Sequence, residues 1–130
     1  MNSKQFLTIG GVVLLLVGIL GMVGIIGPTP AQSIFGDAWW FDSAENIAHT
    51  VLGIAGLIAA FAFPAVWQKY LTILLGVIAV VVGLYSLVGQ SMLYGANLEN
   101  PADTILHLVV GAWALYASLV GDKGSVSKKA

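Results

Sequence analysis

The sequence predicts an all-α membrane protein in which four transmembrane helices form two tandem hairpins, with both termini in the cytoplasm. Three observations predict this fold class. The 130-residue chain is 58% hydrophobic and only 8% charged, whereas a soluble domain carries about 25% charged residues. Its apolar residues fall into four stretches, each near the roughly 20 residues that a helix needs to cross a bilayer. One block of sequence occurs twice, in the second and the fourth stretch.

The four apolar stretches cover residues 6–26, 44–66, 70–93 and 102–120. Helix is the expected conformation of each, because a lone strand in lipid would leave its backbone groups without hydrogen-bond partners. The first stretch follows Lys4 and precedes Thr29-Pro30-Ala31, which loosely resembles a signal-peptide cleavage site. Its apolar run is longer than the roughly 7 to 15 residues of a signal core. We therefore expect a true membrane helix there.

The chain is predicted to be a single transmembrane domain, residues 1–130, built from two repeats. Repeat 1 covers about residues 4–66, repeat 2 about residues 67–120, and residues 121–130 form a short basic tail. The letters FLTI at the start of the first stretch match YLTI at the start of the third, 64 residues later, and the repeated block returns after 58 residues. Each repeat holds two helices, so the copies are parallel and imply a pseudo-two-fold axis along the membrane normal.

Charge placement predicts the orientation. With four crossings, all five lysines lie on one side of the membrane, and every acidic residue except Asp122 lies on the other. Lysine-rich segments stay in the cytoplasm. We therefore predict a multi-pass protein of the cytoplasmic membrane with both termini inside the cell.

The repeated block is the most informative feature for function. It reads ENIAHTVLG at residues 45–53 and DTILHLVVG at residues 103–111, and it holds both histidines of the chain, His49 and His107. Each histidine follows an acidic residue by four positions and precedes a glycine by four. If the helices form a simple up-and-down ring, the second and fourth are diagonal and both histidines point at the shared centre.

The acids and glycines of the block have structural interpretations. Asp42 and Asn100 are good N-cap residues, and Glu45 and Asp103 then fall at the third helical position, as in a capping box. Pro101 would occupy the first helical position, which suits proline. The glycines favour close helix packing, although they would also leave space for a flat cofactor. The acids are interpreted mainly as helix starts that can still act as ligands.

The histidines are harder to explain structurally, because ionisable side chains inside a membrane are rare and often functional. The structural interpretation is a pair of neutral rings, His49 and His107, hydrogen-bonded to helix neighbours. Asn46, Gln90 and Ser86 are the expected partners. Such bonds would hold the outer half of the bundle together.

Three functional interpretations of the histidines remain open beside the structural one. His49 and His107 are candidate cofactor ligands that could clamp a haem axially. With Glu45 and Asp103 they also make a candidate set of two nitrogen and two carboxylate ligands for a divalent metal such as zinc, manganese or iron. In a proton-linked transporter, the same histidines would titrate between about pH 5 and 8.

Other motifs are missing from the sequence. The chain has no cysteine, no arginine and no phosphate-binding glycine loop, and no serine fits a catalytic triad. Its basic tail carries only three lysines, too few to indicate nucleic-acid binding. We expect a non-enzymatic structural or accessory protein, with a redox or metal-handling protein and a proton-linked transporter as alternatives. Its expected partners are the lipid bilayer and either a larger membrane complex or further copies of itself.

The paired pattern Asn46-x-x-His49-x-x-x-Gly53 and Asp103-x-x-x-His107-x-x-x-Gly111 resembles a bacterial family of four-helix membrane proteins catalogued only as a domain of unknown function. The resemblance covers about residues 4–120. Thr104 stands where that family often repeats an asparagine. The resemblance implies the fold and the membrane location, and it implies no activity.

Overall fold

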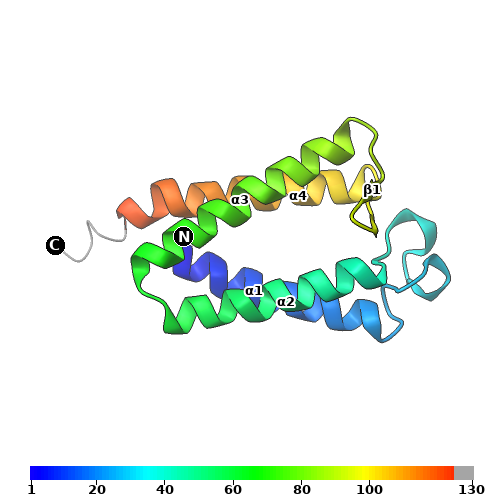
Figure 1. Cartoon of the computed structure of the whole chain (residues 1–130), viewed down its shortest axis with the longest axis horizontal. Helices are drawn as coiled ribbons and strands as arrows, with labels where there is room; N and C mark the ends of the chain where they lie inside the picture. The colour runs from blue at the N-terminus through cyan, green and yellow to red at the C-terminus, as the bar shows by residue number, and fades with distance from the viewer. Residues whose placement is uncertain (125–130) are drawn as a thin grey trace.

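The computed structural model describes residues 1–124, and four long helices make up most of this part of the chain (Figure 1). They are α1 (Ser3–Met22), α2 (Ser43–Ala62), α3 (Ala65–Leu87) and α4 (Ala102–Tyr116), the last continued by the π-helical turn η3 (Ala117–Gly121). All four are long and apolar enough to cross a membrane, α4 when counted through Gly124. The prediction of a mostly helical chain with four helices of membrane-spanning length and composition is confirmed.

Helix α1 lies earlier in the chain than the apolar stretch suggested. Asn2 caps its start, accepting a hydrogen bond from the Gln5 backbone while the Gln5 side chain accepts one from the Asn2 backbone. The helix ends at Met22, and Gly24 then takes a positive φ of 84°. The last apolar residues, 23–26, belong to the outer loop, which also contains the 3₁₀ helices η1 (Pro30–Gln32) and η2 (Gly36–Ala38).

Helix α3 ends at Leu87, before the predicted end at residue 93. A two-stranded antiparallel hairpin follows, made of β1 (Met92–Leu93) and β2 (Ala96–Asn97). Its turn residues Tyr94 and Gly95 both have positive φ, 49° and 85°, as a type I′ turn requires. The apolar residues at the end of the third stretch therefore form part of an outer loop.

The helices pack as two pairs, α1 with α2 and α3 with α4, and the contact between the pairs is much less extensive (Figure 1). Glycines make the close approach within each pair possible. A β-carbon on Gly53 would lie 2.8 Å from the Gly11 oxygen, and one on Gly111 would lie 3.0 Å from the Gly76 oxygen. No larger residue fits these positions without a shift of the backbone or its neighbours.

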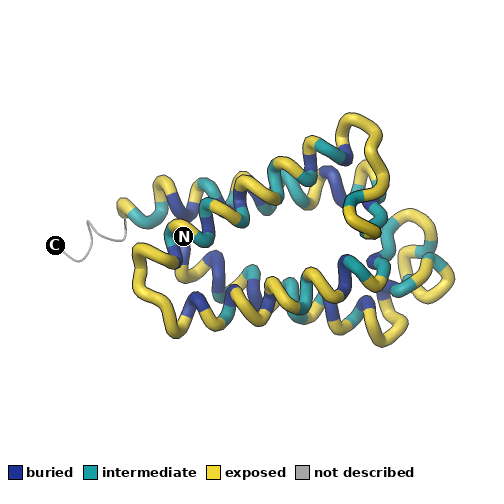
Figure 2. The backbone as a smooth tube through the Cα atoms, in the orientation of Figure 1, coloured by how far each residue is buried: buried dark blue, intermediate teal, exposed yellow. Residues whose placement is uncertain are grey.

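The outward faces of the helices are strongly apolar. Figure 2 shows buried and exposed residues alternating along each helix. Phe61 is 70% exposed and Val109 is 61% exposed, and large aliphatic side chains are exposed on all four helices. Such surfaces are unusual on soluble monomers and are suited to contact with lipid tails.

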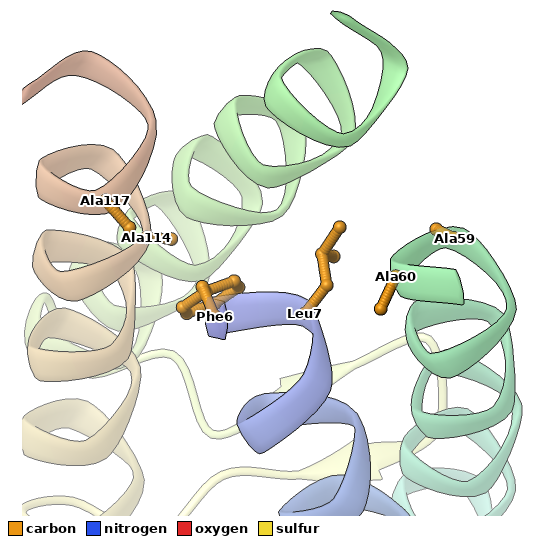
Figure 3. Close-up of a cluster of buried hydrophobic side chains, with 6 residues drawn as sticks. All are labelled: Phe6, Leu7, Ala59, Ala60, Ala114 and Ala117. Atoms are coloured by element: carbon orange, nitrogen blue, oxygen red, sulfur yellow. The ribbon is translucent and has the colours of Figure 1, made fainter. Parts of the chain in front are cut away.

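A small apolar core joins the two pairs near the N-terminal end of α1 (Figure 3). It consists of Phe6, Leu7, Ala59, Ala60, Ala114 and Ala117. The Phe6 ring stacks edge to face on Trp113 of α4, with centroids 4.6 Å apart. Beside this core, the backbone nitrogen and hydroxyl of Ser3 donate hydrogen bonds to the Asp122 carboxylate, at 2.8 and 2.7 Å.

The described residues include only the first four positions, 121–124, of the predicted basic tail 121–130. Residues 121–124 prolong the last helix. The N-terminus lies near this end of α4 (Figure 1). Lys128 and Lys129, on which the tail prediction also depended, lie outside the described residues.

Candidate functional site

A cavity of about 370 Å³ lies between the two helix pairs. Side chains from all four helices line it, and its wall is predominantly apolar. Both predicted cofactor ligands, His49 of α2 and His107 of α4, belong to the wall, and so does Glu45. The prediction that the two histidines face a shared space therefore agrees with the structure.

The cavity has a polar outer end and an apolar inner end. Its outer end carries the two histidines and Glu45, beside the loop residues Leu93, Tyr94, Ala96 and Leu98. The rings of Phe6 and Trp113, which stack edge to face, line the inner end. Along α4 the wall runs from His107 to Trp113, which is about 9 Å at 1.5 Å per helical residue. Pockets of this size and character hold small molecules in many proteins.

His107 is held by its own helix. Its Nδ1 lies 2.7 Å from the backbone oxygen of Asp103. A carbonyl oxygen can only accept, so Nδ1 carries the proton and donates this bond. In the neutral ring, Nε2 is then left with a free lone pair, which can accept a hydrogen bond or bind a metal ion.

His49 is held by packing alone. Its Nδ1 is buried and has no hydrogen-bond partner within residues 1–124. The ring stacks edge to face on Phe41, with centroids 5.4 Å apart and an interplanar angle of 79°. The ring is therefore oriented by an aromatic contact, and its Nδ1 is unused.

Two of the three partners expected for the histidines are engaged elsewhere. The Asn46 amide donates to the Phe41 backbone oxygen at 3.0 Å, and the Ser86 hydroxyl lies 2.7 Å from that of Thr104. The predicted hydrogen bonds from the histidines to Asn46, Ser86 and Gln90 are thus not formed in the part of the chain that the structure describes. The Ser86–Thr104 contact joins the outer ends of α3 and α4, whereas the Asn46 bond is local to the start of α2.

The first copy of the block forms the predicted capping box. Asp42 caps α2 and accepts a hydrogen bond from the Glu45 nitrogen at 2.9 Å. A Glu45 carboxylate oxygen in turn accepts from the Asp42 nitrogen at 3.0 Å. Glu45 is therefore mainly a helix-start residue that also borders the cavity.

The second copy forms no capping box, and the prediction that Asn100 caps α4 is wrong. Pro101 occupies the N-cap position, with an almost helical backbone and no side-chain cap. The buried Asp103 carboxylate turns to the loops. It accepts hydrogen bonds from the Glu99 nitrogen at 2.7 Å and from the Trp39 indole at 3.0 Å. The indole bond joins the first outer loop to the second helix pair.

The proposed metal-ligand set of Glu45, His49, Asp103 and His107 is not assembled. Asp103 is absent from the cavity wall, because both of its oxygens are bound to the loops. Within residues 1–124, no three histidine or acidic side chains gather closely enough to hold a metal ion. The two histidines remain as the candidate ligand-binding pair.

Two residues of this region, Trp39 and Glu99, lie outside the predicted site. Nothing in the sequence context of Trp39 indicates its bond to Asp103. Glu99 lies in the loop before α4, where burial and then the neighbouring Asp103 carboxyl raise its pKa to about 8. Its position four residues before Asp103 is a weak signal, because acidic residues are common in loops.

Comparison with known proteins identifies no relative: no family model, no curated protein and no solved structure matches the chain. The resemblance to the four-helix family of unknown function therefore stays a prediction.

Proposed function

We propose that the protein resides in the cytoplasmic membrane with both termini in the cytoplasm. The described lysines Lys4, Lys69 and Lys123 support this orientation, because they lie at or next to the same ends of the four helices. The acidic residues Asp37 and Glu99 lie at the opposite ends, in the loop between α1 and α2 and in the loop before α4. This separation of basic from acidic residues follows the positive-inside rule.

The two helix pairs are proposed to be tandem copies of one hairpin. Matched contacts support this interpretation: Gly18 approaches Thr50 in the first pair as Gly83 approaches Leu108 in the second. The matched positions are 65 residues apart on α1 and α3, and 58 apart on α2 and α4. The separation of 65 residues between α1 and α3 is one residue longer than the separation of 64 between the matching sequences FLTI and YLTI.

Its proposed role is to bind a membrane-soluble small molecule between the hairpins, without catalysis, as an accessory protein. One observation carries this proposal: both histidines line the same largely apolar cavity, and neither bonds to another helix in the described residues. Both imidazoles are half-buried beside an apolar cavity, and polar groups in apolar surroundings that stabilise no interhelical contact are costly unless a ligand uses them. An elongated molecule would place its polar end at His49 and His107 and its apolar body toward Trp113.

Haem is the second candidate ligand. The supporting observation is the free Nε2 of His107, since an imidazole whose Nδ1 donates to a backbone carbonyl is well oriented for metal ligation. His49, in the same wall, would be the second histidine to hold it. A bound haem would add one-electron chemistry to the site.

The test is to identify what co-purifies with the protein from membranes in a mild detergent. Organic extraction with mass spectrometry detects a lipophilic ligand, and the visible spectrum detects haem. We expect a bound molecule that is lost in the His49→Phe/His107→Phe variant. It should be retained in Tyr116→Phe, whose side chain is exposed on the same helix outside the cavity.

The outcomes separate the candidates. A haem spectrum that depends on both histidines would favour haem over a colourless lipid. Folded wild-type protein that yields no small molecule, and that gives the same extract as the double variant, would contradict the proposed function.

A further inference from the structure

We infer that the cavity selects an amphiphile whose uncharged polar end donates a hydrogen bond, such as a long-chain alcohol or another neutral hydroxyl lipid. This inference rests on the proposed function, because it names the class of ligand for the same cavity. Three features of the wall carry it: the hydrogen-bonding state of the histidines, the distribution of charge, and the apolar inner end.

The first feature is that His107 offers the ligand an acceptor. Its Nδ1 hydrogen is already donated to the Asp103 backbone oxygen at 2.7 Å. A group that meets Nε2 of the neutral ring must therefore supply a hydrogen. Hydroxyl groups do so, whereas ethers, esters and ketones present only acceptors.

The second feature is the absence of a cation for an anionic ligand. No lysine belongs to the described cavity wall, and the sequence contains no arginine. The ionisable side chains nearest the histidines are acidic, Glu45 in the wall and Asp103 one helical turn before His107. A buried carboxylate or phosphate without a paired cation is strongly unfavourable. Fatty acids and anionic phospholipids are therefore poor ligands for this end.

The third feature is the inner end, which fits an apolar chain. Below the histidines the wall is made of small and aliphatic residues, among them Gly10, Gly11, Gly56, Leu75, Ile78 and Ala79. The rings of Phe6 and Trp113 line the far end. A tail that enters at the histidines therefore ends against the Trp113 indole.

The contact with Trp113 provides the assay. Bromine at the end of an alkyl tail quenches indole fluorescence on contact, so three matched probes report on binding: ω-bromohexanol, its methyl ether and ω-bromohexanoate. The protein is reconstituted in lipid nanodiscs, and quenching is titrated at pH 7. The Trp113→Phe variant gives the background from the other three tryptophans.

We expect the alcohol to bind roughly fivefold more tightly than the ether, which is the effect of about one net hydrogen bond. The carboxylate should bind at least as weakly as the ether. In His107→Phe, the preference for alcohol over ether should disappear while the ether still binds. Tyr116→Phe should behave like the wild type.

The results distinguish this inference from the proposed function. If all three probes quench Trp113 with equal affinity, or if the carboxylate binds best, the cavity binds ligands but the inferred selectivity is wrong. If no probe quenches beyond the Trp113→Phe background, the proposed function itself fails.

Discussion

The two helix pairs share a pattern of close backbone contacts but differ in the polar groups at their outer ends. In the first pair the Asn46 side chain is completely buried against Gly21 and bonds the Phe41 backbone. At the corresponding place in the second pair, Thr104 and Ser86 bond each other through their hydroxyls. One arrangement uses a large amide beside a glycine, and the other uses two small hydroxyl residues.

The same close packing of two helices is therefore compatible with different polar contacts at their outer ends. The glycine contacts fix how closely the backbones approach, whereas several polar pairs can fill the space at the outer end. The histidines differ in the same way, since His107 is fixed by a bond to the Asp103 backbone and His49 only by the Phe41 ring. The two candidate ligand-binding residues are therefore not equivalent.

The largest expected effect comes from converting the first outer end into the second. Gly21→Ser should lower the free energy of unfolding by about 3 kcal/mol, because a β-carbon there overlaps the Asn46 side chain and overpacking costs typically 1 to 3 kcal/mol. Asn46→Thr should cost about 1 to 2 kcal/mol through its lost hydrogen bond. The double variant should lose at least about 1 kcal/mol less than the two single losses together.

Unfolding by sodium dodecyl sulfate in mixed micelles, followed by circular dichroism, measures these three values. Strict additivity would show that Gly21 and Asn46 do not share the space as described. The reverse exchange, Ser86→Gly with Thr104→Asn, is the matched test in the second pair.

A smaller difference is expected between the glycines of the two repeated blocks. A β-carbon on Gly53 would lie 2.6 Å from the Leu15 backbone nitrogen, whereas one on Gly111 would lie 2.6 Å from a methyl group of Val80. A side chain can move aside more easily than backbone. Gly53→Ala should therefore cost about 2 kcal/mol and Gly111→Ala about 1 kcal/mol.

Thermal unfolding in detergent measures this pair, with Gly56→Ala as the control. The nearest atom to a β-carbon at position 56 lies at 3.5 Å, so this variant should stay within about 0.5 kcal/mol of the wild type. An equal loss in the two block variants would mean that the second pair is as rigid as the first.

The smallest effect concerns pH and is confined to the second pair. Burial, followed by the Asp103 carboxyl, raises the pKa of Glu99 to about 8 from a usual value of 4.5. Between these values the folded state binds the proton and the unfolded state does not, so the contribution of Glu99 to stability is fully present below about pH 4.5 and is lost as the pH rises through 8.

The melting temperature, recorded across this pH range, should therefore fall less in Glu99→Gln than in the wild type. The exposed Asp37 of the other outer loop provides the control, and Asp37→Asn should keep the wild-type slope. An unchanged slope in Glu99→Gln would show that Glu99 is ionised throughout.

Periodic and compositional features of the sequence were enough to predict the helices. The four apolar stretches anticipate α1 to α4, because residues in lipid must be apolar over the length of a span. Helix ends were predicted less well, since they depend on individual residues. Asp42 and Glu45 form the expected capping box, whereas the Asn100-Pro101-Ala102-Asp103 sequence resembles one and forms none.

The sequence by itself determined that the protein has four membrane-length helices and that its only two histidines occupy matched blocks. The tertiary structure decided what surrounds those histidines. In the fold, the Asp103 carboxylate accepts hydrogen bonds from Trp39 and Glu99. His49 and His107 line one largely apolar cavity. The physical reason is that hydrogen bonds between loops distant in sequence depend on geometry that no local pattern encodes, whereas hydrophobicity and helix capping act within a few residues of the chain.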